Sequence, residues 1–174
     1  KPVQNRTGGP VPLIVMAFPR PEDFDRQADL ASRCLRWQSQ YVHVLRRLES
    51  GRQPLVLDLF CGGGGSSEGV RRAGAVSMGV DSTDQPHFTA RFGGQWFTLG
   101  DALDLERLRG LVRRLRPIGV IASPPCEGFS TATFAGAPSV AERLIAATRD
   151  VLESLGLPYV IENVLGARSE IREH

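Results

Sequence analysis

The 174-residue sequence contains few cysteines and no long apolar run. Its three cysteines, Cys34, Cys61 and Cys126, are an odd number without a Cys-x-x-Cys pair, which argues against a disulfide framework and against a zinc cluster. No apolar run approaches the ~20 residues of a membrane span, and the first residues lack the order of a signal peptide. We therefore expect an intracellular protein of the cytoplasm, nucleoid or nucleus, with reduced thiols, no bound metal and no membrane contact.

The sequence also has little excess of positive over negative charge. The formal net charge is +2 and the pI is about 8.7, values that are compatible with a nucleic-acid partner but do not identify one. A hydrophobic content of 41% and a charged content of 23% are ordinary for a soluble globular domain. The arginines between positions 107 and 116 fit a solvated helix face better than a DNA-binding patch.

The chain divides into three segments by composition. Residues 1–21 hold five prolines and two glycines around one apolar stretch at 11–18, so we expect a loose N-terminal arm with one edge strand. Apolar residues recur at helical spacing through 22–50, which predicts an amphipathic helix as an N-terminal extension. The segment 54–174 has a different rhythm and is expected to be the core domain.

In that core, short apolar runs alternate with helical patterns. The expected strands are 54–60, 75–81, 95–101, 118–124 and 158–164. The expected helices are 66–73, 103–116 and 138–155, with a shorter helix or a loop at 86–92. This alternation predicts an α/β fold with a doubly wound, mostly parallel, Rossmann-like sheet. Ligands of such sheets bind beyond the carboxyl ends of the strands, where strand order reverses.

A run of four glycines, Gly62 to Gly65, follows the first of these strands and leads into a helix that Ser66 or Ser67 is expected to cap. Asp81 closes the next strand, 23 residues after Asp58, at the position from which an acid hydrogen-bonds ribose hydroxyls. Asp101 closes the third strand and is placed to accept from an adenine amino group. Together these features predict a cofactor that contains adenosine.

Other nucleotide sites fit this stretch less well. Gly62 and Gly64 match the Gly-x-Gly-x-x-Gly fingerprint of dinucleotide sites, but its third glycine position is occupied by Ser67. No lysine follows the glycines as it does in a P-loop. A dinucleotide stays open as an alternative, and a P-loop is disfavoured.

The segment "ASPPCEGFS" carries Cys126 behind two prolines, which fix their own φ and restrict the residue before each. A stiff stem suits an attacking sulfur, although a structural cysteine in a proline turn is the plainer interpretation. Glu162 ends the strand expected beside that stem, and burying a carboxylate there is costly unless it is solvated, hydrogen-bonded or used. The three histidines do not follow strands in this way, which disfavours a cysteine hydrolase.

Five motifs in order resemble the DNA (cytosine-5) methyltransferase family. They are "DLFCGGGGSSEG", the acid of "GVD", the "GD" of "LGDA", "ASPPCEGFS" and "IENV", and they span about 54–164. The resemblance implies a fold of the S-adenosylmethionine-dependent methyltransferase type, with S-adenosylhomocysteine as product. The residues that it assigns to the cofactor are Asp58, Phe60, Cys61, Gly62, Gly63, Gly65, Asp81, Ser82, Asp101, Ala102 and Pro124. Of these, the Cys61 side chain is expected to pack rather than to react.

The resemblance also implies the chemistry and the partner. The catalytic residues that it assigns are Cys126, Glu162, Pro125 and Asn163. Cys126 would add to C6 of a cytosine swung out of double-stranded DNA, Glu162 would bind the N3 and amino edge, and Asn163 would orient the loop around them. C5 would then take the methyl group.

The sequence departs from the family at several points. Glu127 stands where glutamine is usual, and Ser82 stands where many relatives place a large apolar residue over the adenine. We expect the sequence to lack the family's later arginine motif, target-recognition region and final helix. The helix expected at 22–50 is a hypothetical substitute for that final helix. The alternatives are a fragment of a longer enzyme, one half of a split enzyme with a second chain supplying recognition, an RNA cytosine-5 methyltransferase, and a noncatalytic cofactor-binding or regulatory subunit.

Overall fold

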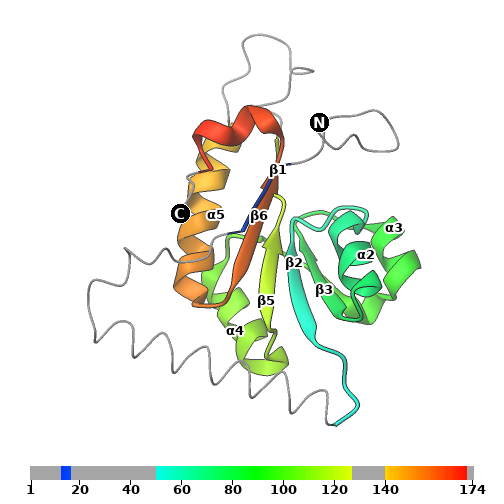
Figure 1. Ribbon diagram of the computed structural model, residues 1–174. Helices are drawn as coiled ribbons and strands as arrows, with labels where there is room; N and C mark the ends of the chain where they lie inside the picture. The colour runs from blue at the N-terminus through cyan, green and yellow to red at the C-terminus, as the bar shows by residue number, and fades with distance from the viewer. Residues whose placement is uncertain (1–12, 17–49, 127–139, 172–174) are drawn as a thin grey trace, which may run out of the picture.

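The computed structural model describes residues 13–16, 50–126 and 140–171. The expected helix at 22–50, apart from its last residue, lies outside the described part, as do Glu127 and most of the expected N-terminal arm. The described residues contain one six-stranded sheet with helices against both of its faces (Figure 1).

Five strands of the sheet are parallel, and each lies within a segment that the sequence predicts as a strand. They are β2 (Leu55–Leu59), β3 (Val76–Asp81), β4 (Phe97–Leu99), β5 (Gly119–Ala122) and β6 (Tyr159–Asn163). The sixth strand, β1 (Leu13–Met16), lies within the expected edge strand and pairs antiparallel with β6. Across the sheet the strand order is β1-β6-β5-β2-β3-β4, which confirms the doubly wound, mostly parallel, Rossmann-like fold.

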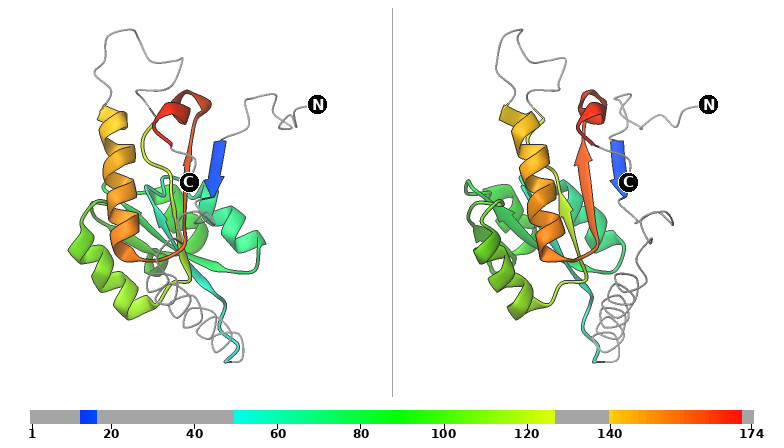
Figure 2. Two further views of the ribbon diagram at one scale, coloured as in Figure 1. Left: turned by 60° about the vertical axis from the view of Figure 1, so that its left-hand side comes forward. Right: turned by 90° about the vertical axis from the view of Figure 1, so that its left-hand side faces the viewer.

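The helices α2 (Gly65–Arg72) and α3 (Pro86–Phe92) lie on one face of the sheet, and α4 (Leu105–Leu115) and α5 (Val140–Leu155) lie on the other (Figure 2). Two 3-10 turns, η2 (Gly94–Trp96) and η3 (Leu165–Ser169), precede β4 and follow β6. The segment 86–92, left open between helix and loop, is therefore a helix. Residues 95 and 96, expected to start a strand, belong instead to η2, so β4 is short.

One local prediction was wrong. Neither Ser66 nor Ser67 caps α2, because the helix begins at Gly65 and its N-cap is Gly64, with no side-chain capping bond. Gly64 holds φ at 84°, a conformation that serine rarely adopts. Ser67 instead lies in the first turn of the helix with 1% of its surface exposed.

The core lies mainly between the sheet and the helices α4 and α5. The strands contribute Leu57, Leu59, Val80, Val120 and Ala122, each at most 2% exposed. The helices contribute Leu108 and Leu152 from the apolar stripes that the sequence predicts. This packing fixes β2 and β5 side by side at the point where strand order reverses.

Candidate functional site

The glycine loop leaves β2 through three residues with positive φ. These are Phe60 at 58°, Gly62 at 46° and Gly64 at 84°. A positive φ strains a residue such as phenylalanine and persists where the surroundings impose it, often at binding sites. A Cβ atom built on Gly62 or Gly65 would meet no heavy atom of the described residues within 4 Å. The backbone at these two glycines therefore has open space beside it.

Asp81, at the end of β3, is joined to this loop. Its Oδ2 accepts from the backbone N–H of Gly62 at 3.0 Å, and its Oδ1 accepts from the backbone N–H and the hydroxyl of Thr83, each at 3.0 Å. Burial raises the pKa of Asp81, but hydrogen bonds from Thr83 and Gly62 outweigh burial and hold the pKa below its usual range. Asp81 is therefore a fixed negative charge that also shapes the loop.

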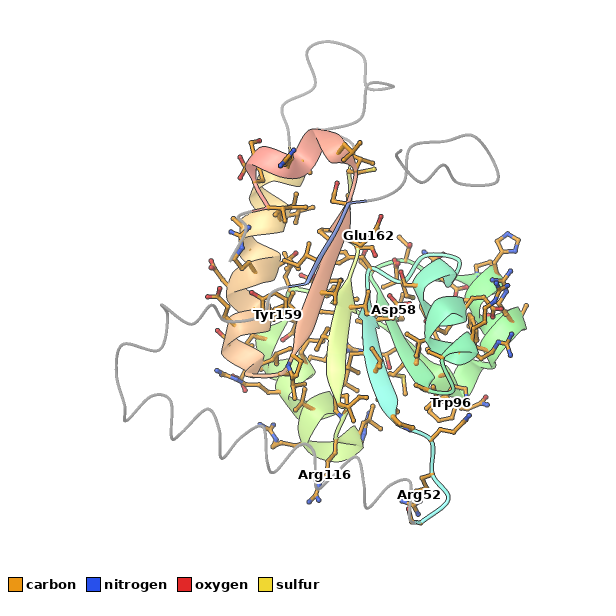
Figure 3. The ribbon with its side chains drawn as sticks, in the orientation of Figure 1. Arg52, Asp58, Trp96, Arg116, Tyr159 and Glu162 are labelled. Atoms are coloured by element: carbon orange, nitrogen blue, oxygen red, sulfur yellow. The ribbon has the colours of Figure 1, made fainter. Side chains whose placement is uncertain are left out.

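Asp58 lies near the carboxyl end of β2, a strand flanked by β3 and β5, and is 1% exposed. The Ser67 hydroxyl donates to its Oδ2 at 2.6 Å, while its buried Oδ1 has no hydrogen-bond partner among the described residues. Burial raises the pKa of Asp58 to about 6, hydrogen bonds from the hydroxyl and the backbone of Ser67 offset part of that rise, and the charge of Asp81 adds to it. Figure 3 places Asp58 within the sheet, below Glu162.

The Cys61 thiol is packed inside this loop. It is 6% exposed, and a Cβ on Gly79 of β3 would lie 2.8 Å from its sulfur. Burial, with the negative charges of Asp58 and Asp81, raises the pKa of Cys61 to about 12. The side chain therefore stays a neutral thiol, in keeping with the packing role expected from the sequence.

The segment after β4 is tied to β3 by its backbone. The N–H of Gly100 donates to the carbonyl oxygen of Asp81 at 2.7 Å, and Oδ1 of Asp101 accepts from the N–H of Leu103 at 2.8 Å. Asp101 is exposed at the edge of the site, as is Ser82. Ala102 is 2% exposed and belongs to the core, so its side chain supports this edge from within.

The Pro-Pro-Cys stem follows β5 and is held from both sides. The N–H of Ser123 donates to the carbonyl oxygen of Leu59 at 3.1 Å, continuing the ladder to β2. On the other side, Nδ2 of Asn163 donates to the carbonyl oxygen of Pro124 at 2.8 Å, and Oδ1 of Asn163 accepts from the N–H of Val164 at 2.9 Å. Asn163 is 2% exposed, so its amide joins the stem to the end of β6 in a buried position.

Glu162 lies one residue before Asn163 and is half-buried. Ile161 pairs with Ala122, so Glu162 lies beside Ser123, three residues before Cys126. Figure 3 shows Glu162 at the carboxyl end of β6. Cys126 is a free, half-buried cysteine, with Pro124 buried and Pro125 exposed before it. The structure thus brings Cys126 and Glu162 to the ends of neighbouring strands at one sheet edge, with the glycine loop on the next strand.

Sequence reasoning gave no role in the site to three polar residues of this edge: Ser67, Ser123 and Thr83. Ser67 supports Asp58, Thr83 supports Asp81, and Ser123 has a buried hydroxyl with no partner among the described residues. Ser67 and Ser123 lie inside two of the quoted motifs and Thr83 directly follows Ser82, and these positions were the available signal. Among the described residues no three His, Cys, Asp or Glu side chains are grouped to hold a metal ion, and no helix is long and apolar enough to cross a membrane.

No family model and no curated protein matches the sequence. Solved structures do match, among them the MycE methyltransferase from the mycinamycin biosynthetic pathway, in complex with Mg and SAH. That match has 19% sequence identity and a TM-score of 0.41, and it covers 76% of this chain and 34% of MycE. The chain therefore spans about a third of the length of that structure.

Proposed function

We propose that this chain transfers a methyl group from S-adenosylmethionine to C5 of cytosine in DNA, through a covalent bond between Cys126 and C6. The observation that carries the proposal is the buried hydrogen bond from Asn163 to the Pro124 carbonyl, 39 residues away in sequence. This bond joins the two most distinctive elements of the resemblance, Pro-Pro-Cys and Glu-Asn-Val. They meet beside the glycine loop, where strand order reverses.

The loop and the ends of β3 and β4 suit an adenosine-containing cofactor. Gly62 and Gly65 leave their backbone open, Asp81 is held as a fixed anion for ribose hydroxyls, and Asp101 is exposed for an amino group. Phe60, Gly63, Ser82 and Pro124 complete the proposed cofactor site. When bound, S-adenosylmethionine supplies a methyl group on a sulfonium centre.

The proposed chemistry uses the stem and the end of β6. After losing its proton, the Cys126 sulfur bonds to C6 of the cytosine, and the displaced electron pair lets C5 accept the methyl group. A base then removes the C5 proton, the S–C6 bond breaks, and the 5,6 double bond returns. Glu162 hydrogen-bonds the N3 and amino edge, which stabilises the charge that develops on the ring. Pro125 limits the freedom of the sulfur.

The proposed substrate is a DNA duplex from which one cytosine is flipped, because C5 and C6 are inaccessible to a thiol inside the stack. RNA offers the same ring, and a second chain contributing substrate recognition would leave the chemistry on Cys126 unchanged. These alternatives differ in the nucleic acid or in the partner needed, so one assay separates them.

The assay incubates the chain with S-adenosylmethionine and random-sequence duplexes whose cytosines are replaced by 5-fluorocytosine on one strand. Fluorine at C5 cannot leave as a proton, so the S–C6 bond persists and denaturing electrophoresis reports it. We expect an adduct that Cys126→Ser abolishes and that Cys34→Ser, the same change at a cysteine outside the five motifs, leaves in place. An adduct on fluorinated RNA alone would move the substrate to RNA. Absence of any adduct on either nucleic acid would overturn catalysis by this chain alone.

A further inference from the structure

The turn between β4 and α4 holds a glycine that its own backbone does not require. Gly100 is not among the described glycines with positive φ, so its backbone conformation does not explain the choice of residue. A Cβ atom at this position would lie 2.7 Å from Cζ and 2.8 Å from Nε of Arg107. The absence of a side chain at Gly100 therefore makes room for the guanidinium of Arg107.

Arg107, in the first turn of α4, reaches back to the end of β4. Its Nη2 donates to the carbonyl oxygen of Leu99 at 2.6 Å. The N–H of the same peptide unit, that of Gly100, donates to the carbonyl oxygen of Asp81 at 2.7 Å. The C=O and N–H of a trans peptide point in opposite directions, so this unit is held from both sides. Arg107 thus takes the place of a neighbouring strand on the outer side of β4, the last strand of the described sheet.

The far end of the turn is fixed through the backbone of Arg107. Its N–H donates to Oδ1 of Asp104, the N-cap of α4, at 3.0 Å. Asp101 lies between the two anchored ends, and its Oδ1 accepts from the N–H of Leu103 at 2.8 Å. The position of the Asp101 carboxylate therefore depends on how Arg107 holds the turn.

Asp101 is the residue that the proposed function places against the amino group of the adenine base. It is exposed, and an ionised carboxylate only accepts hydrogen bonds, so it favours an amino group and disfavours a carbonyl oxygen at the same place. Such a preference requires a fixed acceptor, because a hydrogen bond weakens steeply when its distance or angle is poor. The residue that fixes the turn thus controls how well the base is recognised.

We propose that Arg107 is a positioning residue for Asp101 and thereby determines the selectivity of the site for adenine. This inference rests on the proposed function and adds to it a residue that lies outside the five motifs. Arg107 acts through the peptide unit of Leu99 and Gly100 and does not itself contact the ligand.

The test compares two ligands by isothermal titration calorimetry. S-adenosylhomocysteine carries the amino group on its base, and S-inosylhomocysteine carries a carbonyl oxygen in its place and a proton on N1. We expect the wild type to bind S-adenosylhomocysteine about tenfold or more tightly than S-inosylhomocysteine. In Arg107→Ala the affinity for S-adenosylhomocysteine should fall about fivefold or more, and that for S-inosylhomocysteine should change less than about twofold. The preference therefore narrows, which a loss of stability alone does not produce.

Gly100→Ala is a second variant that acts through the same contact. The added methyl group displaces the guanidinium of Arg107, which is the movable end of a flexible side chain. We expect a similar narrowing of the preference. The double variant should narrow it no further than either single change, since both remove one contact. Additive effects on the preference would contradict a role through that contact.

Arg109→Ala is the matched control, an identical change in the same helix. Nη1 of Arg109 pairs with Oε1 of Glu106 at 2.7 Å along the helix surface. The control should leave both affinities within about twofold of the wild type, and circular dichroism will verify that every variant is folded.

Three outcomes would overturn the inference. If the wild type prefers S-adenosylhomocysteine but Arg107→Ala weakens both ligands equally or neither, Arg107 does not position Asp101, while the cofactor stands. If the wild type binds both ligands equally, Asp101 does not select the amino group, and the inference fails while the cofactor again stands. If the wild type binds neither ligand, the proposed function fails together with this inference.

Discussion

The side-chain amide of Asn163 and the backbone carbonyl of Pro124 form a buried hydrogen bond of 2.8 Å that links the ends of β6 and β5. The same amide accepts from the N–H of Val164 through its oxygen, so both ends of the amide are used. Exchanging the amide nitrogen and oxygen would lose both bonds, so the side chain has a single favourable orientation. Asn163 therefore fixes the position of the stem that carries Cys126.

The isosteric change Asn163→Asp tests this positioning role. The carboxylate still accepts from Val164 but places a negative charge against the Pro124 carbonyl, where the amide donated. We expect unfolding by urea to show a loss of about 1–3 kcal/mol, the cost of a buried carbonyl left without its donor. The rate of adduct formation with fluorinated DNA should fall more than tenfold.

The control for Asn163→Asp is Ser77→Ala, which changes a buried polar side chain away from this edge and so separates an effect on positioning from an effect on stability. If Asn163→Asp lowers stability but forms adduct at the wild-type rate under conditions where both are folded, then Asn163 is structural and does not position Cys126.

The buried carboxyl of Asp58 should make stability depend on pH. Its pKa in the folded state is about 6, above the value of 3.8 for an unperturbed aspartate, so the folded protein binds the proton more tightly than the unfolded chain does. Stability from this group is therefore full below about pH 4 and falls as pH rises to about 6. Two pKa units correspond to about 3 kcal/mol. Urea unfolding between pH 4 and pH 8 measures the change.

Asp58→Asn removes the titrating group while keeping its shape. Asp81 and Cys61 also lie near Asp58 and remain in the variant, as does Ser67 from α2, so the difference between the two proteins isolates Asp58. We expect the wild type to lose stability relative to the variant as pH rises from 4 to 7. Parallel curves over that range would contradict a raised pKa for Asp58.

Much of this fold was predictable because it depends on the pattern of apolar residues and on the glycines and prolines between the elements. Buried runs such as Leu55–Leu59 and the stripe of α4 gave the strands and helices in their order. The arginines of α4 also match the expected solvated face, since Arg109 pairs with Glu106 along the helix surface. Details that depend on tertiary contact were not predictable, such as the N-cap of α2, which is Gly64 where the sequence predicts Ser66 or Ser67.

The candidate site divides in the same way. The spacing of the motifs predicted that Asp81, the glycine loop and the Pro-Pro-Cys stem lie at one edge, because the carboxyl ends of parallel strands share an edge. Spacing could not reveal that Asp81 accepts from Gly62, or that Asp58 is buried with one oxygen unpaired. Those facts depend on the register of β2 with its two neighbours, and sequence patterns do not specify register at this level.

Two neighbouring glycines of the loop should respond differently to alanine. Gly64 has φ of 84°, and an added Cβ would lie 3.0 Å from a ring carbon of Phe88 and closer still to Phe92. Left-handed strain and overpacking together predict a loss of about 2–4 kcal/mol for Gly64→Ala. Gly65 has open space around an added Cβ and begins α2, so Gly65→Ala should change stability by about 0.5 kcal/mol or less.

Ligand binding extends this comparison of the glycines. If a cofactor approaches the loop backbone closely, the methyl group of Gly65→Ala would obstruct it, and calorimetry should show S-adenosylhomocysteine binding weakened about tenfold or more in a stably folded protein. Unchanged binding in that variant would mean that the open space at Gly65 is not where the ligand lies.

The bond between Ser67 and Asp58 gives a prediction whose size depends on pH. Ser67→Ala leaves the buried Asp58 carboxyl without the hydroxyl that donates to it at 2.6 Å, which should raise its pKa above about 6. The lost bond stabilises the charged carboxylate more than the neutral acid, so the loss of stability should be larger at pH 8 than at pH 5. We expect a loss of stability of about 1–3 kcal/mol at pH 8, measured by urea unfolding.

Ser66→Ala, one position away and less buried, is the control and should change stability little at either pH. An equal loss at both pH values in Ser67→Ala would mean that the hydroxyl contributes through packing rather than through the charge of Asp58.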